Sequence, residues 1–381
     1  MGNFAACATT MRTKLPGALN VVICATQVYP GSPPVLAWAL PRKQAGHGVN
    51  SVAKVERSVR AIIFGLLVLL LAACNTGHKP ANSPAKLSQK DIAQQRLQQL
   101  LVPKQVINGG LLATLDVHGL PVPGEARGFT TFIFPSALAS RGSDLYIADS
   151  GARKLYRFNT AMQVMGVVSG ETVLPWTRIQ VGMDRSLYVL DTAQRVIRHY
   201  PPGGQPVHTM GDPSAMASLD SFVIKEGDEI IASDNLNRRL LMFNSLGGPG
   251  WPISTPAIES GLPSLGAMVS AGRAIYAIDS GCPCIVALDD SGQVAGQIGR
   301  GELVQPQELA ADRLGHIFVS DQGDRTLKVF LRGKLIANYA ASALQFMEIT
   351  ALAVEGDTLY VADGPASKVL AFHIQTPIEQ Q

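Results

Sequence analysis

Carboxylates recur at a regular interval through the C-terminal three-fifths of the chain. Six aspartates each end a short apolar run, and consecutive ones lie 42 to 45 residues apart: Asp149, Asp191, Asp234, Asp279, Asp321 and Asp363. A ring of carboxylates could bind a hard cation. An aspartate that ends a strand and enters a tight loop also accepts hydrogen bonds from backbone N–H groups, and six equivalent copies favour this structural role. We therefore predict that these aspartates hold loops.

The elements around these aspartates repeat with them. A short β-branched and aromatic strand ends at each aspartate, a polar loop follows, and a second apolar strand comes next, as in residues 145–149 and 154–158. Another short strand precedes each unit, and several units show a fourth. Four short strands in about 42 residues are typical of a propeller blade, and no unit contains the helical period of a helical solenoid. The predicted fold class is all-β: a six-bladed β-propeller with four antiparallel strands per blade.

The repeat resembles a known family. Leu145-Tyr-Ile-Ala-Asp-Ser-Gly-Ala-Arg-Lys-Leu-Tyr-Arg-Phe158 and Ile317-Phe-Val-Ser-Asp-Gln-Gly-Asp-Arg-Thr-Leu-Lys-Val-Phe330 look like NHL repeats, which run from Ala-Asp through a loop and an Arg to Val-Phe. The resemblance covers roughly residues 129 to 374 and implies an NHL-like six-bladed propeller. Blade four departs from it with Cys284 at the expected Arg position, and blade six departs with Lys368.

The propeller is expected over residues 104–376, followed by a Gln-rich tail at 377–381. Blade six lacks a clear outer strand in the sequence that follows its third strand. We predict that residues 111–117 supply that strand and join the two ends of the propeller, because an unpaired sheet edge is a liability. Residues 88–103 begin with a capping pattern at Ser88 and predict a short N-terminal helix.

The N-terminal region has the pattern of a bacterial lipoprotein leader. Basic residues precede the apolar run at 61–73, which is too short to span a membrane and leads to Cys74. Residues 54–73 are therefore predicted to be a signal peptide, Cys74 the lipidated residue and 74–87 a flexible tether. Residues 1–53 are predicted to be a mis-called or disordered leader. Asn75 after the cysteine suggests sorting to the outer membrane, facing the periplasm.

The net charge of +3 belongs to the leader. Residues 1–73 contain seven Lys and Arg and one Glu, so residues 74–381 carry a net charge of −3. A nucleic-acid partner therefore loses its main support. The partners expected are an envelope protein, peptide or glycan, and the membrane through the N-terminal lipid.

Three charged residues break the repeat beside the predicted central channel. Aligning the inner strands places Arg178 and Glu308 where other blades have small residues, and Asp220 lies one position earlier in its blade. Charges that the repeat does not require are candidates for a binding site at the channel mouth. An ion pair that plugs the channel is the alternative, and the sequence leaves both open.

Basic residues also recur in the loops that follow the aspartates. They are expected on one face of the disc: Arg153, Arg195, Arg238, Arg325 and Lys368. Several NHL propellers bind partners on that face, so the resemblance makes these residues binding candidates. The structural alternative, which the repeat favours, is that each cation pairs with an aspartate of its own or a neighbouring blade; surface pairs of this kind contribute about 0–1 kcal/mol each.

Cys282 and Cys284 are the only ordinary cysteines after the leader, and in an oxidising envelope they can form a local disulfide. A redox or metal role and two reduced cysteines are the alternatives. Lactonase-like propellers hold calcium with a Glu, Asn and Asp set, but here only Asp220 and Glu308 match. No catalytic residue, metal site or cofactor is therefore assigned. The leading function is a binding or scaffolding module, and the alternative is a channel-centred hydrolase or lyase with a divalent metal.

Overall fold

A computed structural model of the chain describes residues 25–26, 35–36, 100–125, 128–168, 170–202, 208–225, 227–244, 247–253, 264–289 and 292–375. The chain divides into two compact units, residues 1–85 and 86–381. In the first, the described part is an antiparallel pair of two-residue strands, β1 (Ala25–Thr26) and β2 (Val35–Leu36). The predicted signal peptide, Cys74, the tether, residues 88–99 of the predicted helix and the tail lie outside the described residues. Among those described, no helix is long and apolar enough to cross a membrane.

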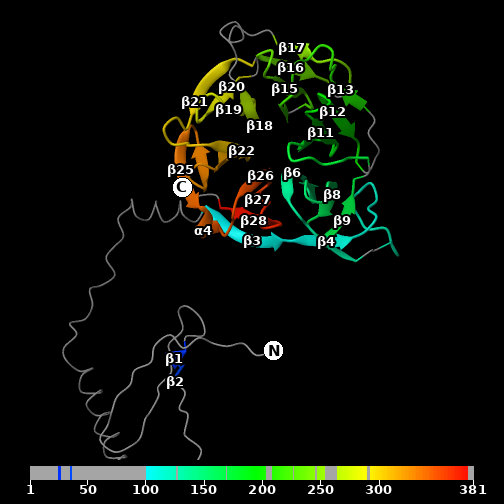
Figure 1. Ribbon diagram of the computed structural model, residues 1–381, viewed down its shortest axis with the longest axis vertical. Coiled ribbons are helices and arrows are strands. Elements are labelled where there is room, and N and C mark those ends of the chain that lie inside the picture. Colours follow the sequence, from blue (N-terminus) through cyan, green and yellow to red (C-terminus); the bar gives the residue numbers. More distant parts are fainter. Residues whose placement is uncertain are drawn as a thin grey trace, which may run out of the picture. The chain divides into compact units, whose positions relative to one another are not determined.

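The second unit is a six-bladed β-propeller, as predicted (Figure 1). Blade one contains β6 (Pro135–Arg141), β7 (Asp144–Asp149), β8 (Lys154–Asn159) and β9 (Val164–Val167). Blade two contains β10 (Arg178–Val181), β11 (Leu187–Asp191), β12 (Val196–Tyr200) and β13 (His208–Met210). Blade three contains β14 (Ser221–Ile224), β15 (Ile230–Asp234), β16 (Arg239–Phe243) and β17 (Trp251–Pro252).

The remaining blades follow the same antiparallel order. Blade four contains β18 (Leu265–Ala271), β19 (Ala274–Asp279), β20 (Cys284–Leu288) and β21 (Val294–Ile298). Blade five contains β22 (Pro306–Ala311), β23 (His316–Asp321), β24 (Thr326–Leu331) and β25 (Lys334–Ala340), and the short helix α4 (Ala341–Leu344) leads on to blade six. Blade six contains β26 (Ile349–Glu355), β27 (Thr358–Asp363) and β28 (Lys368–Ile374).

The core lies between the blades. Six clusters of buried apolar side chains each join two adjacent blades, including blades six and one. Along β7, Leu145 and Ile147 pack with blade six, whereas Tyr146 and Ala148 pack with blade two. Successive side chains of a strand point to opposite faces, so one buried strand serves two interfaces. This explains why the repeated strands are apolar throughout.

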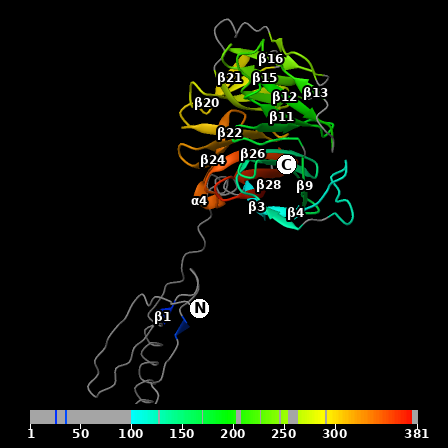
Figure 2. The same cartoon turned by 45° about the vertical axis from the view of Figure 1, so that its right-hand side comes forward.

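The ring is closed by an N-terminal strand, but not by the predicted one. Strand β3 (Leu101–Ile107) pairs antiparallel with β28 as the outer strand of blade six, and the two lie side by side in both views (Figures 1 and 2). Leu101 to Pro103 are thus strand rather than the end of a helix. The register shifts beside Pro103, and β3 is the outermost strand, a place where a proline is tolerated.

The segment predicted to close blade six extends blade one instead. Strand β4 (Gly109–Leu112) pairs parallel with β9, and β5 (Phe129–Thr131) pairs antiparallel with β4. Blade one is therefore part of a six-stranded sheet, with β5 at its outer edge. The prediction for residues 111–117 was wrong: the outer strand of blade six is β3, which begins ten residues earlier in the chain, at Leu101.

Candidate functional site

Six inner strands surround the central channel. Each of β6, β10, β14, β18, β22 and β26 contacts the next, and β26 contacts β6. The first residues of these strands line a cavity of about 500 Å³, and their last residues line a second cavity of about 530 Å³. The two hollows thus lie at opposite ends of the channel, and we call them the first and the second mouth.

Arg178 and Glu308 meet at the first mouth. Arg178 belongs to β10 of blade two and Glu308 to β22 of blade five, and these two blades lie opposite each other in the ring of six blades. Arg178 Nη1 donates to Glu308 Oε1 at 3.2 Å and Oε2 at 3.3 Å. The side chains remain 32% and 21% exposed, so water and small molecules reach the pair. The two residues that the sequence analysis aligned therefore form a bridge across the channel.

The bridge sets the electrostatics of the first mouth. Burial raises the pKa of the Glu308 carboxyl, and the Arg178 guanidinium opposes that rise. Burial is the larger of the two effects, so the carboxyl is easier to protonate than in water. When Glu308 takes up a proton, Arg178 loses its anionic partner and is left as an unpaired cation in the cavity.

Asp220 lies in the wall of the first mouth but takes no part in the bridge. Its carboxylate accepts hydrogen bonds from Ser218 Oγ at 2.6 Å and from the Asn235 backbone N–H at 3.1 Å. The Asn235 side chain in turn bonds the backbone of Leu265, at the start of blade four. Asp220 therefore organises a loop of blade three. Of the three charged residues predicted at the channel mouth, only Arg178 and Glu308 bind each other.

Gln180 lines the first mouth and was not among the predicted site residues. Its Nε2 donates to the carbonyls of Phe222 and Met268 at 2.9 and 3.3 Å, and its Oε1 accepts from Ile224 N–H at 3.2 Å. One side chain of blade two thereby ties blades three and four together. A signal existed: Gln180 is polar where the other aligned inner strands have apolar residues.

The rim of the first mouth carries aromatic and polar side chains. Trp176 is 54% exposed and Phe134 is 36% exposed, and both line the cavity. The polar wall residues are mostly hydroxyl and amide side chains: Ser136, Thr177, Thr192, Gln307, Gln322 and Thr350. Exposed aromatic faces beside groups that donate and accept hydrogen bonds are typical of ligand pockets. Trp176 lies in a loop outside the repeat, so the alignment of strands could not single it out.

The basic loop residues do not share a single position. Arg153, Arg195, Arg238 and Arg325 each follow the aspartate by four residues and have φ between 54° and 57°. In blade six that position is Ser367, and Lys368 is the first residue of β28. Lys368 and Cys284 therefore occupy the next position, opposite the aspartate in the strand register, and the placement of both at the Arg position was wrong by one residue.

Two of these loop cations have partners that the structure defines, and one of those partners is a repeated aspartate. Arg195 Nη1 donates to the Met216 carbonyl at 2.7 Å, and Lys368 Nζ lies 3.7 Å from Asp363. Other strand cations take the predicted pairing role: Arg239 with Asp234, Arg198 with Asp191 and Lys328 with Asp321, at 3.0, 3.0 and 2.6 Å. Arg153, Arg238 and Arg325 are exposed on the loops.

Three of the repeated aspartates hold backbone N–H groups at the entry of an inner strand, which fits the predicted structural role. The Asp149 carboxylate accepts the backbone N–H groups of Ile133 and Phe134 at 2.8 and 2.9 Å, and that of Ala152 at 2.9 Å. Asp321 and Asp363 bind the two N–H groups that precede their own inner strands in the same way. Each of these three carboxylates thus fixes the segment that leads into an inner strand.

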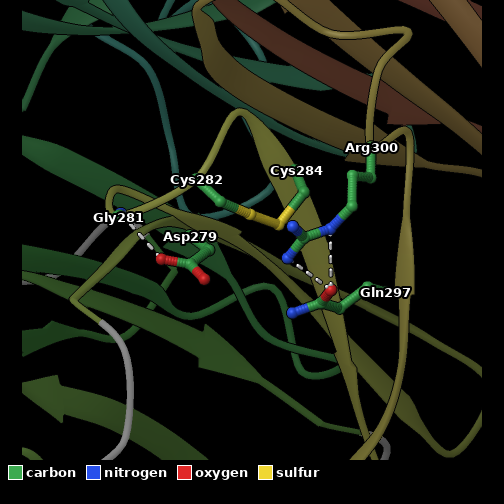
Figure 3. The surroundings of a disulfide bond; sticks show 6 residues. All are labelled: Asp279, Gly281, Cys282, Cys284, Gln297 and Arg300. Atoms are coloured by element: carbon green, nitrogen blue, oxygen red, sulfur yellow. Dashed lines mark hydrogen bonds between the residues drawn. A yellow bond between two sulfur atoms is a disulfide. The ribbon is translucent and has the colours of Figure 1, made fainter.

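Cys282 and Cys284 form a disulfide in the loop between β19 and β20 (Figure 3). Asp279, Cys282 and Cys284 are also the one group of three potential metal ligands found in the described part of the chain. The carboxylates lining the first mouth have other partners: Arg178 binds Glu308, Ser218 and Asn235 bind Asp220, and Gln322 binds Glu348.

Comparison with known proteins supports the fold. Neither the protein-family models nor the curated proteins contain a match to this sequence. Among solved structures, a gluconolactonase from Xanthomonas campestris is similar over 72% of this chain and 97% of that one, at 14% identity and a TM-score of 0.51. A Bacteroides thetaiotaomicron protein of unknown function is similar over 64% and 70%, at 11% identity and the same TM-score. At such identities the similarity shows a shared propeller architecture.

Proposed function

We propose that this propeller is a non-catalytic binding module and that its ligand occupies the first mouth. The observation that carries the proposal is the cross-channel pair of Arg178 and Glu308, which lines a cavity together with the exposed Trp176. The pair offers a cation and an anion to polar groups, and the aromatic ring offers a flat apolar contact. A protein loop, a peptide or a glycan presents both kinds of group.

The chemistry of the carboxylates favours binding over metal-assisted hydrolysis. A calcium ion needs six or more oxygen ligands. Glu308 is bound to Arg178, and Asp220 to Ser218 and Asn235, so a cation at this mouth would have to displace the protein's own donors. The gluconolactonase shares only the architecture with this chain, and propellers host unrelated functions. Metal-dependent hydrolysis at the channel is the competing function, and the first experiment is designed to detect it.

The first experiment combines two measurements on the purified protein. Metal content by mass spectrometry, with melting temperatures measured with and without a chelator, should show no bound ion and no effect of the chelator. Peptide and glycan arrays should then yield ligands that bind without being altered. One calcium or zinc per chain, a large loss of melting temperature on chelation and turnover of lactones or esters would instead identify a hydrolase.

We also place the module in the bacterial cell envelope, anchored by a lipid on Cys74. The support is the sequence pattern of basic residues, a short apolar run and a cysteine preceded by small residues. Lipidation requires the thiol, so Cys74→Ala should move the protein from the membrane fraction to the soluble fraction. Cys284→Ala, at another cysteine, is the matched control and should leave fractionation unchanged. Equal membrane association of the Cys74 variant and the native chain would contradict the anchor.

A further inference from the structure

Blade four has a different loop after its aspartate. In five blades the fourth residue after the aspartate has a positive φ: Arg153, Arg195, Arg238, Arg325 and Ser367, with φ of 54° to 57°. In blade four that residue is Pro283, whose ring fixes φ near −65° and forbids this turn. The loop instead places the Cα atoms of Cys282 and Cys284 5.3 Å apart, joined by a disulfide.

This disulfide contributes little to holding the fold. It closes a loop with one intervening residue, and the chain-entropy gain from a cross-link falls as the loop shortens. Hydrogen bonds hold the loop independently of the disulfide: Gly281 N–H donates to the Asp279 carboxylate at 2.7 Å, and Cys284 N–H donates to the Cys282 carbonyl at 2.7 Å. Stabilisation of the fold therefore does not explain why two cysteines lie at this point of the loop.

The two sulfurs differ in access. Cys282 is partly exposed in the loop, whereas Cys284 begins β20 and is fully buried. The Asp279 carboxylate, itself largely buried, lies within 4.8 Å of both sulfurs. Arg300 completes the surroundings, with its guanidinium held by Gln297 Oε1 at 3.2 and 2.9 Å (Figure 3). Cys282 can thus meet a partner, Cys284 cannot, and a carboxylate that can exchange a proton lies near both sulfurs.

We propose that Cys282 and Cys284 form a thiol–disulfide exchange site that oxidises a dithiol in a partner protein or peptide. A thiolate of the partner attacks Cys282 Sγ, a new sulfur–sulfur bond forms, and the bond to Cys284 breaks with its electron pair on Cys284 Sγ. The second partner thiolate then attacks the partner's own sulfur in the mixed disulfide and releases Cys282 as a thiolate. The partner leaves as a disulfide, and this chain is left as a dithiol that takes up two protons.

Asp279 has a defined role in this exchange. Its carboxylate lies within 4.8 Å of both sulfurs, a separation that one bridging water spans, so it can take the proton of a thiol arriving at Cys282 and return it to the sulfur of Cys284. Asp279 would act as a positioning and proton-transfer group, and its replacement should slow exchange more at low pH than at high pH, where the thiols are already ionised. This inference stands apart from the binding function at the first mouth.

The test uses the full chain and a synthetic peptide with two cysteines as the dithiol. One peptide disulfide should form for each protein disulfide consumed, and peptide-resolved mass spectrometry should find the two new thiols at Cys282 and Cys284. With oxidised glutathione, Cys284→Ala should carry the adduct on Cys282 at a level roughly tenfold above that of Cys284 in the Cys282→Ala variant, because only Cys282 is accessible. Melting temperatures of both variants check that they fold.

Three results would overturn the proposal. The disulfide could resist the dithiol until the protein unfolds, which would make it structural. The two matched alanine variants could accept glutathione equally, which would remove the distinction between the sulfurs. The native protein could also be isolated with a metal ion on both thiols and no disulfide, which would make Asp279, Cys282 and Cys284 a metal site.

Discussion

The buried aspartates are the residues on which the blade geometry depends most directly. Asp149 satisfies three backbone N–H groups at once, and its own carboxylate is fully buried. We predict that Asp149→Ala lowers the free energy of unfolding by about 2–4 kcal/mol, because it leaves those donors without a partner. Denaturant titration measures this. Asp357→Ala, which removes a 65% exposed carboxylate, is the matched control and should cost less than about 1 kcal/mol. Equal losses would refute the loop-holding role.

The raised pKa of Glu308 predicts how stability depends on pH. Its folded pKa lies above the ordinary value of 4.5, so the folded protein holds this proton more tightly than the unfolded chain. The contribution to stability is therefore fully present below pH 4.5 and is lost as pH rises through the folded pKa. Relative to Glu308→Gln, the native protein should gain stability as pH falls from 7 toward 4.5. Denaturant midpoints across that range measure the difference, and a constant difference would contradict the shift.

Arg178→Ala and Glu308→Ala should each leave the propeller folded, since both side chains retain access to water. Circular dichroism and melting curves of the single variants and of the double variant check this. If both single variants unfold and the double variant does not, the pair is a structural plug, and the first mouth loses its proposed role.

At the scale of elements, the sequence predicted that an N-terminal strand completes blade six, but it did not identify β3 as that strand. The need for an outer strand in blade six followed from counting strands. The sequence points to residues 111–117 because they form a spare strand-like segment just before blade one, whereas β3 contains Pro103. Pairing at an edge beside a bulge accommodates that proline, and only three-dimensional context shows that the position is an edge.

Closure by β3 can be tested with two truncated chains. A chain beginning at residue 100 retains β3, and a chain beginning at residue 108 lacks it. The first should unfold cooperatively near the native melting temperature. The second should melt well below it or aggregate, because blade six loses its outer strand and β28 becomes an unpaired edge. Identical melting curves for the two chains would show that β3 does not hold the ring closed.

At the scale of the whole molecule, the repeat determines the architecture, and the residues that depart from the repeat at the first mouth mark the candidate site. The six-bladed ring, the register of the inner strands and the role of the aspartates could all be predicted, because each follows from one period repeated six times. Gln180 and Trp176 could not be predicted as readily, since the first acts through contacts with two other blades and the second lies in an irregular loop. We propose that the function of this propeller resides at the residues that break the repeat.

The two mouths of the channel provide a control within one molecule. The first is lined by Trp176 and Arg178, and the second by Arg141 and Arg313. A ligand that occupies the first mouth must respond to changes there and remain indifferent to changes at the other end of the channel. Both ends belong to the same inner strands, so a general loss of folding would affect both alike.

The most direct test is a calorimetric titration of an array-selected ligand into four proteins: the native chain, Trp176→Ala, Arg178→Ala and Arg313→Ala. The account predicts that each change at the first mouth weakens binding by roughly tenfold or more, as for a central contact of an interface. Arg313→Ala, at the second mouth, should bind like the native chain. Unchanged affinity of both first-mouth variants, or a loss confined to Arg313→Ala, would contradict the claim that the first mouth is where this propeller binds.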